Sequence, residues 1–259
     1  MALALAACNA EPDAPASNVV TKARQSPVPP PVPAPKPFAF EEENDLVDFS
    51  FGWSAEAAAV PQLVSRFREE MAKNRAQLLA SARADKVERE KSGFDVHQYE
   101  SSTDYSTAGQ SDRLLSLEVN SSQFTGGAHP NHGTAALLWD RGAAKEIKVA
   151  DLFADPRNSD RLLTQRWCDA LNKAREEKRG EPVGGGGMFD ECPKLDEIAI
   201  VPVDGGQDGR FDKLALIASP YVAGPYVEGD YEVELAVTPD LVAGMKAEYR
   251  GSFEVAQLQ

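Results

Sequence analysis

The stretch FTGGAHPNHGTAALLWD, residues 124–140, holds two of the chain's three histidines, His129 and His132. The run before it, residues 111–125, alternates apolar and polar side chains, and the stretch itself ends in an aliphatic run. A pair of glycines precedes the histidines, and glycine adopts positive φ at no steric cost, so the chain can reverse here. We therefore predict a turn between two antiparallel strands. Whether the histidines also form a site stays open at this point.

Outward from this turn, strand patterns alternate with single helical patterns. Apolar residues alternate through residues 47–53 and then recur at helical spacing from Pro61 to about Arg89, with Gly93 beyond the end. A second helix is predicted between a cap at Asn158 or Ser159 and Gly180. Residues 94–106 and 111–125 are predicted to form a hairpin of two strands around residues 108–110. Further strands are predicted within residues 133–140, 145–153, 196–204, 213–219 and 231–237. Thr238 is predicted to begin a short helix.

This alternation predicts an α+β fold with antiparallel sheets, each packed by a single helix. We divide the globular part into two small subdomains, residues 38–153 and 154–259. Residues 180–188, GEPVGGGGM, are predicted to form a flexible loop between a helix and a strand.

The amino-terminal residues resemble the leader of a bacterial lipoprotein. An apolar run, residues 1–7, ends at Cys8 and is followed at once by a polar segment rich in proline, residues 8–37. In that class of protein the cysteine is lipidated, and two or three acyl chains are needed because one chain binds a membrane reversibly. The resemblance implies export and a lipid anchor in a membrane of the bacterial cell envelope, with residues 8–37 as a semi-rigid tether.

Two further cysteines, Cys168 and Cys192, would enter an oxidising compartment in an exported chain. A disulfide between them closes a loop of about 25 residues and contributes roughly 3 to 4 kcal/mol in the chain-entropy model. In a cytoplasmic chain they would instead be buried thiols.

The charge of the chain limits its partners. The formal net charge is -14 and the isoelectric point is about 4.7. A surface that binds nucleic acid needs a surplus of Lys and Arg, so we exclude nucleic acid as a partner. A cationic protein, in contrast, is attracted to such a surface. No apolar run after the leader reaches the roughly 18 residues of a membrane-spanning helix.

Catalytic and metal-binding patterns are weak. Pro130 and Asn131 separate the two histidines, so no helix aligns them as in HExxH, and we predict neither a metal nor a cofactor. A GxSxG motif is missing, and the four glycines from Gly184 to Gly187 match no phosphate-binding motif. His129 can brace the turn through a ring nitrogen bonded to the backbone, which needs no metal.

Tyrosines punctuate the segment SPYVAGPYVEGDYEVELAV, residues 219–237. Tyr221, Tyr226 and Tyr231 combine a large apolar area with one hydroxyl, which suits a core edge and a binding surface equally. Both interpretations stay open.

Two segments together resemble a known family of envelope domains. The first has an aromatic residue, a Gly-Gly-Ala-His turn, a Gly-centred turn and an Asp-Leu-Phe end, and the second is a Tyr-Pro-Gly segment before a strand. The matching positions are Phe124, Gly126, Gly127, Ala128, His129, Gly142, Asp151, Leu152 and Phe153, and then Pro220, Tyr221, Gly224, Pro225, Tyr226 and Gly229. The sequence from residue 38 onwards resembles the RsiV-like domain, found in RsiV-type anti-sigma factors and before the catalytic domain of PdaC-type peptidoglycan deacetylases.

The resemblance implies non-catalytic recognition at the cell wall. RsiV-type proteins bind lysozyme, a strongly cationic enzyme, which agrees with an acidic surface. The signature residues Phe124, Gly126, Gly127 and His129 and the tyrosines Tyr221 and Tyr226 are then the candidates for ligand contact. Signalling and deacetylation do not carry over, because the sequence shows neither a sigma-binding segment nor a deacetylase domain.

Three functional hypotheses follow. The first is a lipid-anchored protein that recognises peptidoglycan or a cationic wall-active enzyme such as lysozyme. The second is a peptidoglycan-directed hydrolase or deacetylase that uses His129, and the third is a purely structural envelope lipoprotein. The sequence favours a non-catalytic role and leaves catalysis open.

Overall fold

The computed structural model describes residues 34–184 and 186–256. The predicted leader, the lipidation site Cys8 and residues 8–33 of the predicted tether lie outside the described residues. Residues 35–184 and 186–256 belong to one compact unit. Within the described ranges, none of the helices combines the length and the apolar character needed to cross a membrane.

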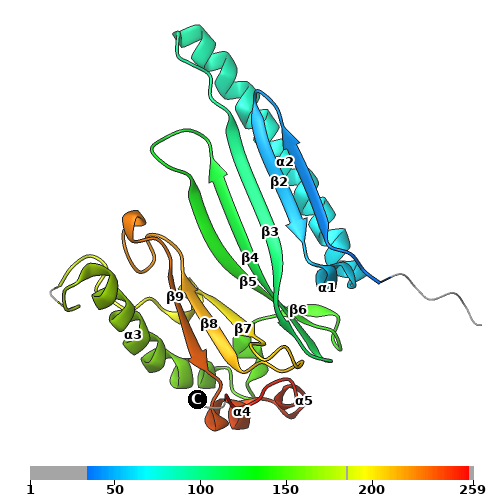
Figure 1. Ribbon diagram of the computed structural model, residues 1–259, viewed down its shortest axis with the longest axis vertical. Helices are drawn as coiled ribbons and strands as arrows, with labels where there is room; N and C mark the ends of the chain where they lie inside the picture. Colours follow the sequence, from blue (N-terminus) through cyan, green and yellow to red (C-terminus); the bar gives the residue numbers. More distant parts are fainter. Residues whose placement is uncertain (1–33, 185, 257–259) are drawn as a thin grey trace, which may run out of the picture. The chain divides into compact units, whose positions relative to one another are not determined.

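Six strands form the larger sheet in sequence order (Figure 1). They are β1 (Phe38–Glu43), β2 (Val47–Trp53), β3 (Tyr99–Gln110), β4 (Leu114–Phe124), β5 (Asn131–Asp140) and β6 (Lys145–Ile147). Neighbouring strands pair antiparallel except β2 and β3, which are parallel. A parallel pair needs a long crossover connection, and helix α2 (Pro61–Ser92) supplies it. The predicted α+β class is confirmed, and the larger sheet is mixed because of this one crossover.

Helix α2 packs on one face of this sheet. Pro61 lies in its first turn, and Gly93, with φ of 72°, ends the helix. The backbone N–H groups of this cap donate hydrogen bonds to the carbonyl oxygens of Arg89 and Glu90. Leu63 and Phe67 are fully buried against Phe51, Trp53, Leu115 and other strand residues. The predicted helix is confirmed, and it continues three residues past Arg89 because no residue before Gly93 breaks it.

The second sheet has three antiparallel strands, β7 (Ala199–Val203), β8 (Lys213–Ala218) and β9 (Tyr231–Ala236). Helix α3 (Arg157–Arg179) covers one face of it with Leu163, Trp167 and Leu171, which are all fully buried (Figure 1). The other face packs on the larger sheet through a small cluster of residues, namely Ala199, Val201, Ala215 and Ile217 with Ala108 and Ala136.

The remaining helices are short. They are α1 (Ala55–Ala58), η1 (Val149–Leu152), η2 (Leu195–Glu197), η3 (Tyr226–Glu228), α4 (Pro239–Gly244) and α5 (Ala247–Arg250). Thr238 caps α4, as predicted, by accepting a hydrogen bond from Leu241 N–H. The disulfide between Cys168 and Cys192 is present and ties α3 to the segment before β7.

Several element boundaries differ from the sequence-based expectation. Strand β1 was missed, because its three consecutive glutamates resemble a solvated segment. The hairpin turn lies at residues 111–113 instead of 108–110. Gly109 belongs to a bulge in β3, where a Cβ would lie 2.7 Å from Asp204 and 2.9 Å from Phe211. Helix α3 begins at Arg157 after Pro156, and Ser159 Oγ donates to the Pro156 carbonyl instead of capping the helix.

Candidate functional site

The reversal predicted from the sequence joins β4 to β5. Gly126 and Gly127 have φ of 95° and 123°. A Cβ on Gly126 would also lie 2.5 Å from His97 Nε2, so this position excludes side chains for two independent reasons. The Phe124 ring lies 6.0 Å from the His97 ring, which places Phe124 at the base of the reversal.

His129 is held from three directions. Its Nδ1 lies 2.9 Å from the Pro130 carbonyl oxygen, so Nδ1–H is the donor in this contact. Its ring stacks on Tyr226 with centroids 3.5 Å apart, and its Nε2 lies 3.3 Å from the Tyr221 hydroxyl. His129 therefore braces the backbone of its own turn and joins that turn to the tyrosine segment.

His132 makes the second link between the same segments. Its Nδ1 lies 3.4 Å from the Tyr226 hydroxyl, and its Nε2 lies 3.4 Å from Asp230 Oδ1. The Asp230 contact lacks hydrogen-bond geometry, and this carboxylate oxygen is buried with no hydrogen-bond partner among the described residues. We call His129, His132, Tyr221, Tyr226 and Asp230 the histidine–tyrosine cluster.

Charged groups at the end of α3 fix the position of the tyrosine segment. Arg179 donates to both carboxylate oxygens of Glu228 at 3.0 and 3.1 Å, and the Tyr231 hydroxyl donates to the same carboxylate. Burial raises the pKa of Glu228, but the bonds from Arg179 and Tyr231 outweigh it and lower the pKa overall. Lys178 Nζ donates to the carbonyl oxygens of Glu228 and Asp230 at 2.8 and 2.6 Å. The backbone of the tyrosine segment is thus fixed by one ion pair, between Arg179 and Glu228, and by the hydrogen bonds from Lys178.

Arg175 connects this segment to the disulfide loop. Its side chain is fully buried, and it donates to the carbonyl oxygens of Ala223 at 3.0 Å and Glu191 at 3.1 Å. Glu191 precedes the disulfide residue Cys192. The disulfide and the buried guanidinium together hold the loop beneath the tyrosine segment.

The cluster presents an aromatic surface to solvent. Tyr221 is 56% exposed, and it has φ of 71°, which is rare for a residue other than glycine. Val227, in η3 beside Tyr226, is 91% exposed. Both histidines face tyrosine hydroxyls, and within residues 34–184 and 186–256 there is no group of three His, Cys, Asp or Glu side chains suited to a metal. Two tyrosine rings beside a carboxylate suit the recognition of a cationic or aromatic partner.

A second polar cluster lies at the opposite end of β5, around Asp140. This carboxylate is fully buried and accepts five hydrogen bonds, two from Arg113, one from Tyr249 and one each from the Gly142 and Ala143 amides. Burial raises the pKa of Asp140, but these donors outweigh it and lower the pKa to about 2. A Cβ on Gly142 would lie 2.8 Å from the Arg113 guanidinium carbon, so the predicted Gly-centred turn makes room for this ion pair.

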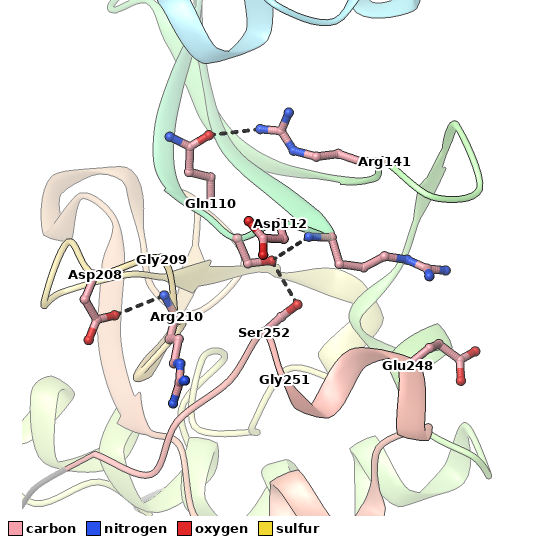
Figure 2. A pocket seen from close by; sticks show the side chains of 11 residues that line it. Gln110, Asp112, Arg141, Asp208, Gly209, Arg210, Glu248, Gly251 and Ser252 are labelled. Carbon is pink, nitrogen blue, oxygen red and sulfur yellow. Dashed lines mark hydrogen bonds between the residues drawn. The ribbon is translucent and has the colours of Figure 1, made fainter. Parts of the chain in front are cut away.

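A hollow of about 820 Å³ lies next to Arg113 (Figure 2). Arg141 and Arg210 both line it, yet Arg141 points to Gln110, to which it donates at 2.9 Å, and Arg210 points away from both. Asp112, Asp208 and Glu248 line the same hollow. The arginines do not converge, so the hollow offers no defined anion site.

The sequence signature and the structure overlap in part. The histidines of the reversal and the tyrosines of residues 219–231 come together across more than 90 residues of sequence. Sequence reasoning missed Asp230, Arg175, Arg179 and Glu228. The only local signal for them is the helical spacing of Arg175 and Arg179, one turn apart in α3.

Comparison with known proteins supports the predicted resemblance. Residues 41–132 match a family model described as Deacetylase PdaC, and this match ends at His132 in the reversal. No curated protein matches the sequence.

Two crystal structures of DUF3298 family proteins are similar in fold. The protein from Bacteroides fragilis NCTC 9343 is 18% identical, with a TM-score of 0.53, over 85% of this chain and 97% of that one. The protein from Pseudomonas aeruginosa PAO1 is 16% identical, with a TM-score of 0.49, over 82% of this chain and 96% of that one. At 18% identity the likeness to the Bacteroides fragilis protein concerns the fold alone.

Proposed function

We propose that this chain is a lipid-anchored, non-catalytic recognition protein of the bacterial cell envelope. In this proposal Cys8 carries the anchor, residues 8–37 form the tether, and the histidine–tyrosine cluster binds a cationic wall-active protein such as lysozyme. The observation that carries it is the exposed tyrosine surface at Tyr221, whose segment is held in place by the ion pair between Arg179 and Glu228, in a chain with a net charge of -14. The resemblance to RsiV-type proteins supports the choice of partner.

The chemistry of the cluster suits a protein partner that is rich in Lys and Arg. Tyrosine is enriched among the residues that dominate binding energy in interfaces, and its ring face attracts a cation. Asp230 adds a carboxylate whose side chain is 34% exposed in the same cluster. Because Arg175, Lys178 and Arg179 already fix the backbone, little ordering entropy is lost when a partner binds.

Calorimetric titration with lysozyme at low salt tests the proposal. We expect binding that weakens as salt is added, since salt screens the attraction between surface charges. The double substitution Tyr221→Ala/Tyr226→Ala is expected to weaken binding by about tenfold or more. The matched control is Phe94→Ala, which removes an aromatic ring that is 66% exposed beyond the end of α2.

Two outcomes would contradict this proposal. One is the lack of any lysozyme binding at low salt. The other is equal weakening by Phe94→Ala and by the double tyrosine substitution, since the histidine–tyrosine cluster would then have no special role.

The family description favours a second candidate function, deacetylation of peptidoglycan with His129 as the base. Both ring nitrogens of His129 already have partners, which supports a bracing role instead. Acetate release from peptidoglycan by the wild type, abolished in His129→Ala at an unchanged thermal midpoint, would replace the proposed function by this one.

A further inference from the structure

A groove with an unusual lining lies between α2 and the sheet, and none of its lining residues belongs to the histidine–tyrosine cluster. Its volume is about 340 Å³. Its lining residues are Asn74, Gln77, Leu78, Ser81, Ser101, Ser102, Thr103, Ser121, Ser122, Gln123 and Thr125. All are uncharged and all but Leu78 are polar, in a chain where 26% of the residues are charged. We call this the polar groove.

The floor of the polar groove interrupts an apolar face. At one end of the larger sheet the side chains facing α2 are buried and apolar, among them Tyr105 and Leu117. Two residues further along β3, Thr103 pairs with Ser121, and two residues beyond that Ser101 pairs with Gln123. Because side chains alternate along a strand, these residues continue the same face. This face is therefore polar along β3 and β4 at residues 101–103 and 121–123, although Phe49 and Phe51 on the neighbouring strand β2 remain buried and apolar.

The helix beside the floor changes in the same place, and the floor residues Ser121 and Gln123 are exposed to solvent. Asn74, Gln77, Leu78 and Ser81 follow the i, i+3, i+4, i+7 spacing of one helix face. The same face buries Phe67 about two turns and Leu63 about three turns before Asn74. Both walls of the groove thus carry hydroxyls and amides where a packed core would need hydrocarbon. A dry contact at this point would leave these polar groups unsatisfied at a cost of about 1–3 kcal/mol each.

These groups are free to bind a ligand. Among the described residues, Ser121 is the only one of the lining polar residues whose side chain makes a hydrogen bond within the chain, to the Gly133 carbonyl oxygen at 3.3 Å. Serine and threonine hydroxyls and side-chain amides each donate and accept. The groove therefore presents many two-way hydrogen-bonding groups and no charge.

We propose that the polar groove is a binding site for a neutral glycan chain. Sugar hydroxyls also donate and accept, and a neutral ligand needs no ion-pair partner, which the lining does not supply. A peptide fits this site less well, because peptide strands bind at open sheet edges, where backbone groups are unpaired. The floor here is a sheet face whose strands, β3 and β4, are already paired on both sides.

The glycan site goes beyond the proposed protein recognition and has its own set of residues. Ser121 and Ser122 pair with Gly133 and His132 on β5, so both sites lie at the same end of the larger sheet. Substitutions that affect one site leave the side chains of the other in place, and the two proposals can therefore fail separately.

The experiment is a titration of the full-length chain with chitotetraose, a neutral β-1,4-linked tetramer of N-acetylglucosamine, followed by NMR. We expect saturable shifts in residues of β3, β4 and α2 and no weakening at high salt, since no charges are paired. The triple substitution Ser101→Ala/Thr103→Val/Ser121→Ala is expected to weaken binding by about tenfold. Ser65→Ala, an exposed serine on α2 outside the groove, is the matched control.

Circular dichroism first establishes that the triple variant is folded, and Gln77→Ala on the helix wall provides an independent second variant. An unchanged affinity in Tyr221→Ala/Tyr226→Ala supports a separate site. The proposal is overturned if chitotetraose does not bind saturably, or if neither the triple variant nor Gln77→Ala weakens its binding. It is also overturned if only Tyr221→Ala/Tyr226→Ala abolishes that binding. Lysozyme binding that persists in each of those cases would leave the proposed function intact.

Discussion

Asp140 and Asp230 are both aspartates beside a β-strand, and both contact aromatic or basic side chains, yet their surroundings differ sharply. Asp140 is fully buried and accepts five hydrogen bonds. The Asp230 side chain is 34% exposed, and its Oδ1 lies 3.4 Å from His132 without hydrogen-bond geometry. Asp140 is hydrogen-bonded by five donors within the chain, whereas the buried Oδ1 of Asp230 has no hydrogen-bond partner among the described residues and the rest of its side chain is partly exposed.

This difference separates structural polar groups from those available for binding. A buried carboxylate with every acceptor satisfied stabilises one arrangement of the chain and has nothing left for a ligand. A half-exposed carboxylate beside two tyrosines adds little stability, and its capacity remains for a partner. Substitutions at the two positions should therefore affect different properties.

The largest expected effect is that of Asp140→Ala. It leaves the Gly142 and Ala143 amides, the Tyr249 hydroxyl and the Arg113 guanidinium without their acceptor. We expect the free energy of unfolding to fall by about 3 kcal/mol or more, measured by urea denaturation. Asp112→Ala, at an exposed aspartate in the neighbouring turn, is the control and should change stability by less than about 0.5 kcal/mol. Similar losses in both variants would remove the distinction.

A smaller effect is expected from acid. The pKa of Asp140 is about 2 in the folded chain, compared with 3.8 for an aspartate without these partners. The folded state therefore favours the charged form. The stability that this shift contributes is fully present above pH 3.8 and is lost as the pH falls towards 2. Asp140→Asn cannot titrate, so its thermal midpoint should fall less steeply than that of the wild type between pH 4 and pH 2. Parallel profiles would show that other carboxylates, such as Glu228, account for the acid sensitivity.

The smallest effect on stability is expected from Asp230→Ala. Lys178 binds the backbone carbonyl of Asp230, so the substitution leaves that clamp in place. We expect the free energy of unfolding to change by less than about 0.5 kcal/mol, while the affinity for lysozyme falls several-fold. A large loss of stability with unchanged affinity would make Asp230 a structural residue like Asp140.

Local patterns in the sequence predicted most of the fold. The α2 and α3 helices follow from apolar spacing and from the glycines at 93 and 180, whose positive φ ends each helix. The disulfide and the α+β class also follow. The parallel pairing of β2 with β3 does not, because the same alternation suits either direction and only the path of α2 decides it. The bulge at Gly109 depends on Asp204 and Phe211, which are distant in sequence.

The candidate site was predictable only as separate pieces. The reversal with His129 and the tyrosine segment were each visible, but their stacking was not, because no periodicity relates residue 129 to residue 226. The polar groove gave no signal either. The run YESSTDYS, at the start of β3, predicts an ordinary exposed strand, and nothing in it indicates that α2 lies alongside.

The sequence by itself determined most of the elements, the glycines that end the two long helices, and that the chain is acidic, because these depend on neighbours within a few residues or on composition. The tertiary structure alone decided which aspartate is buried and which is free. It also decided that two histidines meet two tyrosines, and that polar residues of β3, β4 and α2 line one groove. These depend on contacts across tens of residues, whose geometry is set only when the two sheets and their helices pack together.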